Sequence, residues 1–458
     1  MSNGKEAPVE ADYRVLADEM AQLIADGTLR PGEQLPTQRA YARRRGIAAS
    51  TATRVYRELV RRGLVAGEVG RGSFVRAAPG PGAVALAEPA DARVDLELNY
   101  PVVPGQAELL ARSLGSLLRP DALADALRPI GVAGTGAARA RFARLAAAPG
   151  WTPAAHDILF AGNGRQAAAA AVSALVPTGG RLGVEALTYP GVKGLAERSG
   201  IALVPLPMDE AGPVPAALAE IHRSAPLRAV YLQPRVHNPL GVSWPEQRRA
   251  ELAEVLRACD LPVIEDAVWS FLSAPGLPPL AASLPERVVV IDSLSKRLAP
   301  GLTVGFLIAP DSMRPALATA LRASAALPGA FALEAAVRWL DDGIVAEICE
   351  AKRADAAVRR RLARELLPRR RPSAAQDSYS LWWELPEPWR ADTFAAAARE
   401  LGIAVTAGAA FAADPRTTPR AVRLGLASPP LDVLRRTLTT LGALAERHRV
   451  TQSPASSP

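Results

Sequence analysis

The chain has 458 residues, enough for two or three domains, and its 49% hydrophobic and 22% charged residues are typical of a globular protein. Its two cysteines, Cys259 and Cys349, are far apart and have no CxxC partner, which argues against a disulfide scaffold or a cysteine-based zinc site and fits a reducing cytoplasm. The N-terminus has no signal-peptide core and no apolar run reaches membrane-spanning length. We therefore expect a cytoplasmic protein with no membrane segment and no metal site.

The formal net charge of +8 is unevenly distributed along the chain. Residues 39–62 contain eight arginines and one acid, a density that suggests a polyanionic partner. A solvated helix face in an arginine-rich chain would have the same composition, so the charge alone leaves both interpretations open. The order of the elements around this stripe favours the polyanion.

The first 76 residues predict three short helices followed by a hairpin. Apolar residues follow helical spacing in YRVLADEMAQLIADG, and RPGEQLP ends that helix. Thr37 can cap a second helix, TQRAYARRR, which Gly46 ends. A third helix, STATRVYRELVRRG, precedes LVAGEVGRGSFV, which predicts two strands joined at Gly70-Arg71-Gly72. This is the order of a winged helix-turn-helix domain, which lays its third helix in the major groove of DNA.

Residues 1–76 resemble the GntR family of regulators, through LRPGEQLPTQRAYARRRGIAASTATRVYRELVRRGLV and GRGSFV. The resemblance implies a double-stranded DNA operator as partner. Hydroxyls and arginines at a helix start suit contacts to phosphates and base edges. Taken singly, Thr51 could be an ordinary helix residue and Arg54 a solvated charge. The residues that the resemblance places against DNA are Arg39, Ser50, Thr51, Arg54, Arg71 and Gly72.

A linker rich in Pro, Gly and Ala is predicted over residues 77–93. Beyond it, apolar strands alternate with alanine-rich helices, a pattern that predicts an α/β fold with a mainly parallel sheet. We expect a large domain over residues 94–315, a smaller α+β domain over 316–447 and a disordered tail over 448–458.

Lys296 ends an apolar strand in RVVVIDSLSK, and it is one of only four lysines in a chain with fifty arginines. A position that needs only positive charge would accept arginine, whereas a nucleophilic amine requires lysine. Polar residues also end neighbouring strands, and GNGRQ begins a helix whose N–H groups can hold a phosphate; these residues are Asn238, Asp266, Ser293, Ser295 and Gly164. Together they suit pyridoxal 5′-phosphate (PLP), with the two serines and Gly164 at its phosphate.

Residues 94–447 resemble fold-type I aminotransferases through GNGRQ, EALTYPG, HNPLG, VIED and SLSKRLAPGL. The resemblance implies that Lys296 forms a Schiff base with PLP and that Asp266 bonds the pyridine nitrogen. It also implies that Tyr189 stacks on the ring, that Asn238 donates to the phenolic oxygen, and that Arg423 in AVRLGLA binds the carboxylate of a substrate or effector. Each has a structural alternative, since Asp266 could cap a helix, Asn238 could form a turn and Arg423 could be an exposed charge.

A winged helix joined to an aminotransferase-like domain resembles the MocR subgroup of GntR regulators, over almost the whole chain. The subgroup implies a head-to-tail homodimer in which each DNA-binding domain crosses to its partner's large domain. The family's phosphate-binding arginine is replaced here by Thr303, and the tyrosine expected after Asp266 is replaced by Val268 or Trp269. A tyrosine expected near RPIGVAG is also missing. These departures predict little or no turnover.

Three functions are therefore open at this stage. The one we favour is a transcription regulator whose DNA binding responds to PLP, or to a small amino compound that forms an aldimine with PLP. The second is an active aminotransferase with an accessory DNA-binding domain. The third is a regulator that has lost its cofactor.

Overall fold

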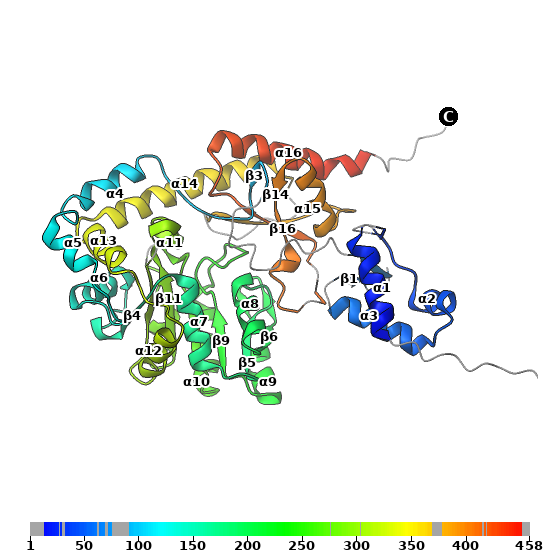
Figure 1. The fold of residues 1–458 in the computed structure, drawn as a ribbon, viewed down its shortest axis with the longest axis horizontal. Helices are drawn as coiled ribbons and strands as arrows, with labels where there is room; N and C mark the ends of the chain where they lie inside the picture. The colour runs from blue at the N-terminus through cyan, green and yellow to red at the C-terminus, as the bar shows by residue number, and fades with distance from the viewer. Residues whose placement is uncertain are drawn as a thin grey trace, which may run out of the picture.

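In the computed structural model, a small N-terminal domain precedes a larger body of two parts (Figure 1). The structure describes residues 13–26, 28–29, 33–61, 64–68, 72–75, 91–274, 276–302, 304–368, 378–414, 416–417 and 419–450. Four sequence-based predictions fall outside the described residues, namely those for Arg71, for most of the linker, for Thr303 and for residues 451–458.

The N-terminal domain has the predicted helix and hairpin order. Its elements are α1 (Tyr13–Ala25), α2 (Gln38–Arg45), α3 (Ala49–Arg61) and the antiparallel strands β1 (Val65–Glu68) and β2 (Gly72–Val75). The predicted cap of the second helix is confirmed, because the Thr37 side chain accepts a hydrogen bond from the Ala40 N–H and Gly46 ends the helix in the left-handed conformation. Val55 and Leu59 are fully buried in its core.

A seven-stranded sheet forms the centre of the large domain. Its strand order is β4-β12-β11-β10-β9-β5-β6, and only β12 runs antiparallel to its neighbours. Buried apolar side chains cover both faces of the sheet, as expected for parallel strands between layers of helices. The strands are β4 (Ile158–Ala161), β5 (Arg181–Glu185), β6 (Ala202–Leu206), β9 (Ala229–Leu232), β10 (Val263–Asp266), β11 (Val288–Ser293) and β12 (Gly305–Ile308).

The helices of this domain surround the sheet (Figure 1). α7 and α12 pack against each other on one face, and α10 and α13 contribute to the core on the other. α12 therefore belongs with the large domain, although we placed the domain boundary at residue 316. The helices are α4 (Gln106–Leu114), α5 (Pro120–Ala126), α6 (Gly136–Ala146), α7 (Gly164–Leu175), α8 (Pro190–Arg198), α9 (Pro215–Ser224), α10 (Glu246–Ala258), α11 (Leu294–Arg297), α12 (Arg314–Ala323) and α13 (Ala330–Asp341).

The small domain has its own sheet and core. β13 (Ser380–Glu384), β16 (Ala421–Gly425) and β15 (Thr406–Ala407) are antiparallel, and α14 (Ile344–Leu366), α15 (Ala391–Glu400) and α16 (Leu431–Val450) accompany them. β3 (Val94–Asp95) pairs in parallel with β14 (Ile403–Ala404), so the chain leaves the linker through the small domain. α16 continues to Val450, three residues into the segment that we expected to be a tail.

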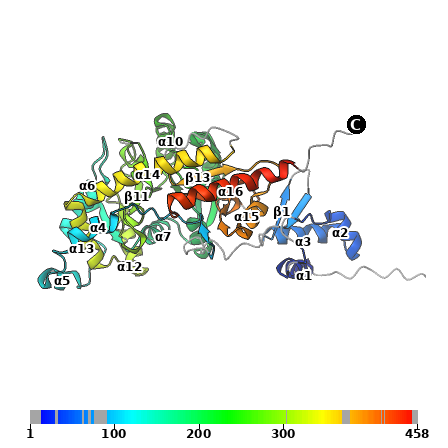
Figure 2. The same ribbon diagram turned by 90° about the horizontal axis from the view of Figure 1, so that it is seen from above.

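The winged helix lies beside the small domain in both views (Figures 1 and 2). The guanidinium of Arg390 lies over the ring of Phe74 in β2, 4.7 Å from its centroid. No helix among the described residues is both long enough and apolar enough to cross a lipid bilayer.

Candidate functional site

A cavity of about 200 Å³ opens where the sheet meets the small domain. Polar residues at the carboxyl ends of β9, β10 and β11 and at the N-terminus of α7 face it, as is usual for open α/β sheets. The structure brings to this one cavity all eight residues predicted for it from the sequence: Gly164, Tyr189, Asn238, Asp266, Ser293, Ser295, Lys296 and Arg423.

The amine of Lys296 is held inside the cavity. Its Nζ donates a hydrogen bond of 2.8 Å to the main-chain carbonyl of Asn99. Aromatic rings flank it, with the centroid of Tyr100 at 4.4 Å and that of Trp269 at 5.4 Å. Three nearby cations act against the ammonium form, in opposition to this carbonyl and these rings.

This environment lowers the pKa of Lys296 from an ordinary value of 10.5 to about 7. Burial is the main cause, because it removes water from around the ammonium, and the positive charges of Arg423, Arg165 and Lys352 act in the same direction. A large fraction of the amine is therefore neutral at physiological pH. A neutral amine is the form that attacks a carbonyl carbon.

Asp266 ends β10 on the cavity side. Its carboxylate accepts hydrogen bonds from the Tyr231 hydroxyl and, at 3.0 Å, from the Val268 N–H. Burial raises the pKa of Asp266 to about 6, in opposition to these two hydrogen bonds, which lower it. A cationic ring nitrogen placed beside this carboxylate would favour its ionised form.

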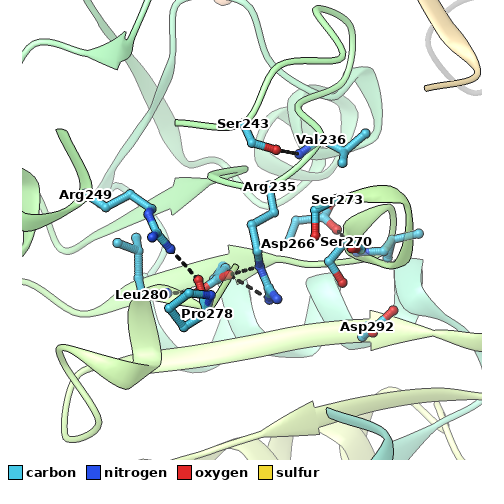
Figure 3. A network of polar contacts seen from close by, with 12 residues as sticks. Arg235, Val236, Ser243, Arg249, Asp266, Ser270, Ser273, Pro278, Leu280 and Asp292 are labelled. Carbon is cyan, nitrogen blue, oxygen red and sulfur yellow. Dashed lines mark hydrogen bonds and ion pairs between the residues drawn. The ribbon is translucent and has the colours of Figure 1, made fainter. Parts of the chain in front are cut away.

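Two buried ion pairs lie on the face of the sheet opposite the cavity, and they involve the strands β10 and β11 that carry the site residues. Because side chains alternate along a strand, Glu265 points away from the cavity while Asp266 faces it. Glu265 is fully buried and pairs with Arg235 at 2.9 Å, as Figure 3 shows for the network around Arg235. On β11, Asp292 pairs with Arg297 at 2.6 Å, and the next residue, Ser293, faces the cavity.

The N-terminus of α7 forms one end of the cavity. Asn163 caps it by accepting the Gln166 N–H, which leaves the earlier N–H groups for another acceptor. A side chain at Gly164 would meet Ser293 Cβ at 3.1 Å, so Ser293 would have to move by a few tenths of an ångström to admit one. The hydroxyls of Ser293 and Ser295 are 2.8 Å apart at the same end. This set of donors suits a phosphate group.

Arg423 reaches the cavity from β16 of the small domain. It is 6% exposed, and its Nη2 donates to the main-chain carbonyl of Glu97 and to the Thr406 hydroxyl. Its Nε has no partner in the structure, and neither has Oδ1 of Asn238. Unpaired buried polar atoms are costly, so their position beside the cavity points to a polar ligand.

The sequence analysis missed several residues that line this cavity. Tyr231 lies inside the apolar strand AVYLQ and gave no separate signal, although a hydroxyl buried in a strand needs a partner. Arg165 lies within the GNGRQ motif and adds a cation at the phosphate-binding end.

Glu97 and Asn99 supply main-chain carbonyls, which no side-chain pattern reveals. Val268 and Trp269 both line the cavity where a tyrosine was expected.

A second surface of interest lies on the winged helix. Arg39 on α2 and Ser50 and Arg54 on α3 are exposed, and Thr51 is half-buried. The Thr53 hydroxyl donates to Gln38 at 2.9 Å, which fixes α2 against α3. Gly72 begins β2 at a φ of +113° that only glycine adopts readily.

Comparisons with known proteins identify two protein families in this chain. The sequence matches the aminotransferase class I and II family over residues 129–441 and the bacterial regulatory proteins of the gntR family over residues 12–75. It is similar in structure to an archaeal alanine:glyoxylate aminotransferase, with a TM-score of 0.71 and 20% identity over 80% of this chain and 93% of that one. The chain therefore belongs to the aminotransferase class I and II family and carries a gntR-type DNA-binding domain.

Two transcription regulators are similar to this chain over both its DNA-binding and its aminotransferase-like parts. The chain is 28% identical over 420 residues to the HTH-type transcriptional regulator YdeF of Bacillus subtilis, which covers 91% of this chain and 90% of the relative. It is 29% identical over 379 residues to the pyridoxine biosynthesis regulator PdxR of Corynebacterium glutamicum, over 79% and 78% of the two chains. This protein is a transcription regulator of the MocR type.

We predict that PLP added to the purified protein acquires its lysine-bound visible absorbance at a rate that rises through about pH 7. The reason is that the amine of Lys296 loses its proton near that pH. Stopped-flow absorbance between pH 5.5 and 9.5 measures the profile. Lys296→Ala should remove the absorbance and Lys193→Ala should not. A midpoint near the ordinary value for lysine would contradict the environment described for Lys296.

We predict that Arg39→Ala and Arg54→Ala weaken operator binding while PLP absorbance is unchanged. A good base contact is worth about 1–3 kcal/mol, and loss of a phosphate contact lowers the salt dependence of binding. Fluorescence anisotropy at several salt concentrations measures both effects. Arg223→Ala, an exposed arginine of the large domain, is the matched control. Wild-type affinity in both variants at every salt concentration would show that the recognition surface lies elsewhere.

Proposed function

We propose that this regulator binds PLP at Lys296 and that its DNA binding responds to PLP, or to a small amino compound that reacts there. The proposal rests on one observation. The amine of Lys296, whose pKa is lowered to about 7, lies in the same cavity as the Asp266 carboxylate and the N-terminus of α7. The relative PdxR is named for the regulation of pyridoxine biosynthesis, which supports a ligand of this class.

The residues present fit PLP as a ligand. Bound PLP would supply an aldehyde carbon that an amine can attack and a protonated pyridine ring that withdraws electrons. Lys296 would provide the attacking amine, and Asp266 would hold a proton at the ring nitrogen. Ser293, Ser295 and the α7 N-terminus would bind the phosphate. Tyr189 would cover the ring, and Asn238 would donate to its phenolic oxygen.

Arg423 supports an effector that carries a carboxylate. Its guanidinium lies in the same cavity as Lys296 and keeps an unpaired Nε. A planar guanidinium binds a carboxylate through two parallel hydrogen bonds. An α-amino acid or a similar amino compound offers both an amine for the PLP aldehyde and a carboxylate for Arg423.

One segment connects this cavity to the DNA-binding domain. The amine of Lys296 donates to the carbonyl of Asn99, and the guanidinium of Arg423 donates to the carbonyl of Glu97. Both cations of the cavity therefore bond the main chain of residues 97–99. This stretch follows the linker within a few residues. A ligand that engages either cation would remove a hydrogen bond from the segment and could shift the winged helix. Coupling of about 1–3 kcal/mol is enough to change operator affinity 5- to 150-fold.

Slow turnover fits the chemistry of the site. Transamination requires a fixed pose of the ring and phosphate, and small misplacements of reacting groups can cost on the order of 10²-fold in rate. Thr303 supplies no charge where the family has arginine, and Trp269 supplies no phenol. The alternative is an active aminotransferase, which the fold of the structural neighbour permits. We further propose a cytoplasmic homodimer, which suits an operator with two-fold symmetry.

Operator binding with and without ligands tests the function. An operator selected from a random DNA library would be titrated with the protein alone, with PLP, and with PLP plus each of a panel of amino compounds. We expect affinity to change at least fivefold with PLP or with one amine. Multiple-turnover assays with amino donors and keto-acid acceptors run in parallel. Rapid turnover together with an operator affinity indifferent to PLP would establish the enzyme instead.

We predict that Asp266→Ala retains part of the PLP binding but loses the spectral change caused by amines. Without the carboxylate, the ring nitrogen is less readily protonated and the ring withdraws electrons less effectively. Absorbance titration with the amine that acts on the wild type measures the loss. Asp125→Ala, an exposed acid, is the control. An unchanged spectral response of the Asp266 variant to amines would contradict the role of Asp266 at the ring nitrogen.

A further inference from the structure

Lys352 is a second lysine buried beside the reactive one. It lies on α14, and its side chain is fully buried. Its Nζ donates to the main-chain carbonyl of Lys296 at 3.0 Å and to that of Leu298 at 2.5 Å. These carbonyls end the four-residue helix α11, where helical carbonyls lack partners within the helix. The ammonium of Lys352 therefore satisfies the carbonyl of the residue whose side chain carries the reactive amine.

The presence of lysine rather than arginine at position 352 suggests that this position requires an ammonium group. Four lysines stand against fifty arginines, and two of the four meet at α11. Other buried cations on the same helix are arginines, among them Arg359 and Arg360, and both also donate to main-chain carbonyls. An ammonium is a compact charge with three donors, whereas a guanidinium is a wide planar fork.

The neighbours of Lys352 keep it in place. The Tyr379 hydroxyl lies 2.9 Å from both the Lys352 carbonyl oxygen and the Asp355 carboxylate, and its single hydrogen is donated to one or the other. Cys349 and Asp355 on α14 favour its charged form, while burial lowers its pKa to about 8. Lys352 is therefore mostly protonated near pH 7. The charged groups that act on Lys296 come from β16, α7 and α14, namely Arg423, Arg165 and Lys352.

We propose that Lys352 is a positioning residue for Lys296: its ammonium anchors the Lys296 carbonyl, fixes where the reactive amine lies, and disfavours a second positive charge there. The proposal deepens the function above, since it concerns the same PLP site. The anchor acts on the main chain of Lys296, and the charge acts on its side chain, so the two effects can be separated.

The experiment measures Lys296 in protein without PLP. Pulses of formaldehyde and borohydride at pH 5.5 to 10 methylate neutral amines, and mass spectrometry of the peptide 288–297 gives the fraction modified, with Lys193 as internal reference. Lys352→Gln keeps a donor for the carbonyls but removes the charge, so the labelling midpoint should rise by about half a pH unit, because Lys352 is the weakest of the three charges that act on Lys296. Lys352→Arg keeps a permanent charge and should leave the midpoint at or below the wild-type value. Arg360→Gln, a buried cation of α14 that contacts Ser380 instead, is the matched control.

A second measurement isolates the anchor from the charge. The rate at which PLP absorbance appears is measured at pH 7.5, where Lys352 is still mostly protonated, and is divided by the neutral fraction of Lys296 that the labelling gives, so that it reports position. We expect Lys352→Met, which has no donor for the two carbonyls, to be slower by on the order of tenfold, and Lys352→Gln to stay closer to the wild-type rate. A wild-type labelling midpoint in Lys352→Gln, a raised midpoint in Lys352→Arg, or an equal shift in Arg360→Gln would overturn the proposal. Absence of PLP binding by the wild-type protein would instead overturn the proposed function, because the labelling requires no PLP.

Discussion

The hydrogen bond from the Lys296 amine to the Asn99 carbonyl is the contact on which the organisation of this protein depends. It joins the end of a strand of the large sheet to a segment that enters through the small domain. Burial and three neighbouring cations lower the pKa of the amine in this place, although the carbonyl and the flanking rings favour its charged form. The same environment that makes the amine reactive also leaves its hydrogen bond easy to exchange for another partner.

The buried ion pairs behind the site explain how such an unfavourable arrangement is tolerated. Each places a carboxylate on the face of the strand opposite the cavity, in Glu265 with Arg235 and in Asp292 with Arg297. Breaking a buried pair leaves an uncompensated charge, so these strands resist displacement. Asp266 and Ser293 each follow one of these carboxylates in the sequence, so the ion pairs also restrict the movement of these two cavity residues. Specificity of position, rather than net stability, is what such pairs contribute.

The residues at strand ends could be predicted because a parallel sheet gathers them at one edge. Asn238, Asp266 and Ser293 each follow an apolar run, and this local pattern was sufficient. Arg423 of the small domain was predicted only through the family resemblance of AVRLGLA, because its place at the cavity depends on how the two domains pack. Lys352 shows the limit most clearly, since EAKRADAAVRRR has the composition of an exposed helix face although its lysine is fully buried.

The double attachment of residues 97–99 has a consequence for how signals combine. Lys296 and Arg423 hold neighbouring carbonyls from different domains, so the loss of one hydrogen bond leaves the segment tethered by the other. A molecule that occupies only the lysine and one that occupies only the arginine would each produce a partial change. Loss of both contacts would free the Glu97 and Asn99 carbonyls, but the segment would stay on the small domain, because the Asn99 side chain bonds Ser380 and Ala427 and the Ser428 hydroxyl donates to the Leu98 carbonyl. Two ligands bound together would therefore loosen the segment more than either ligand alone, without detaching it.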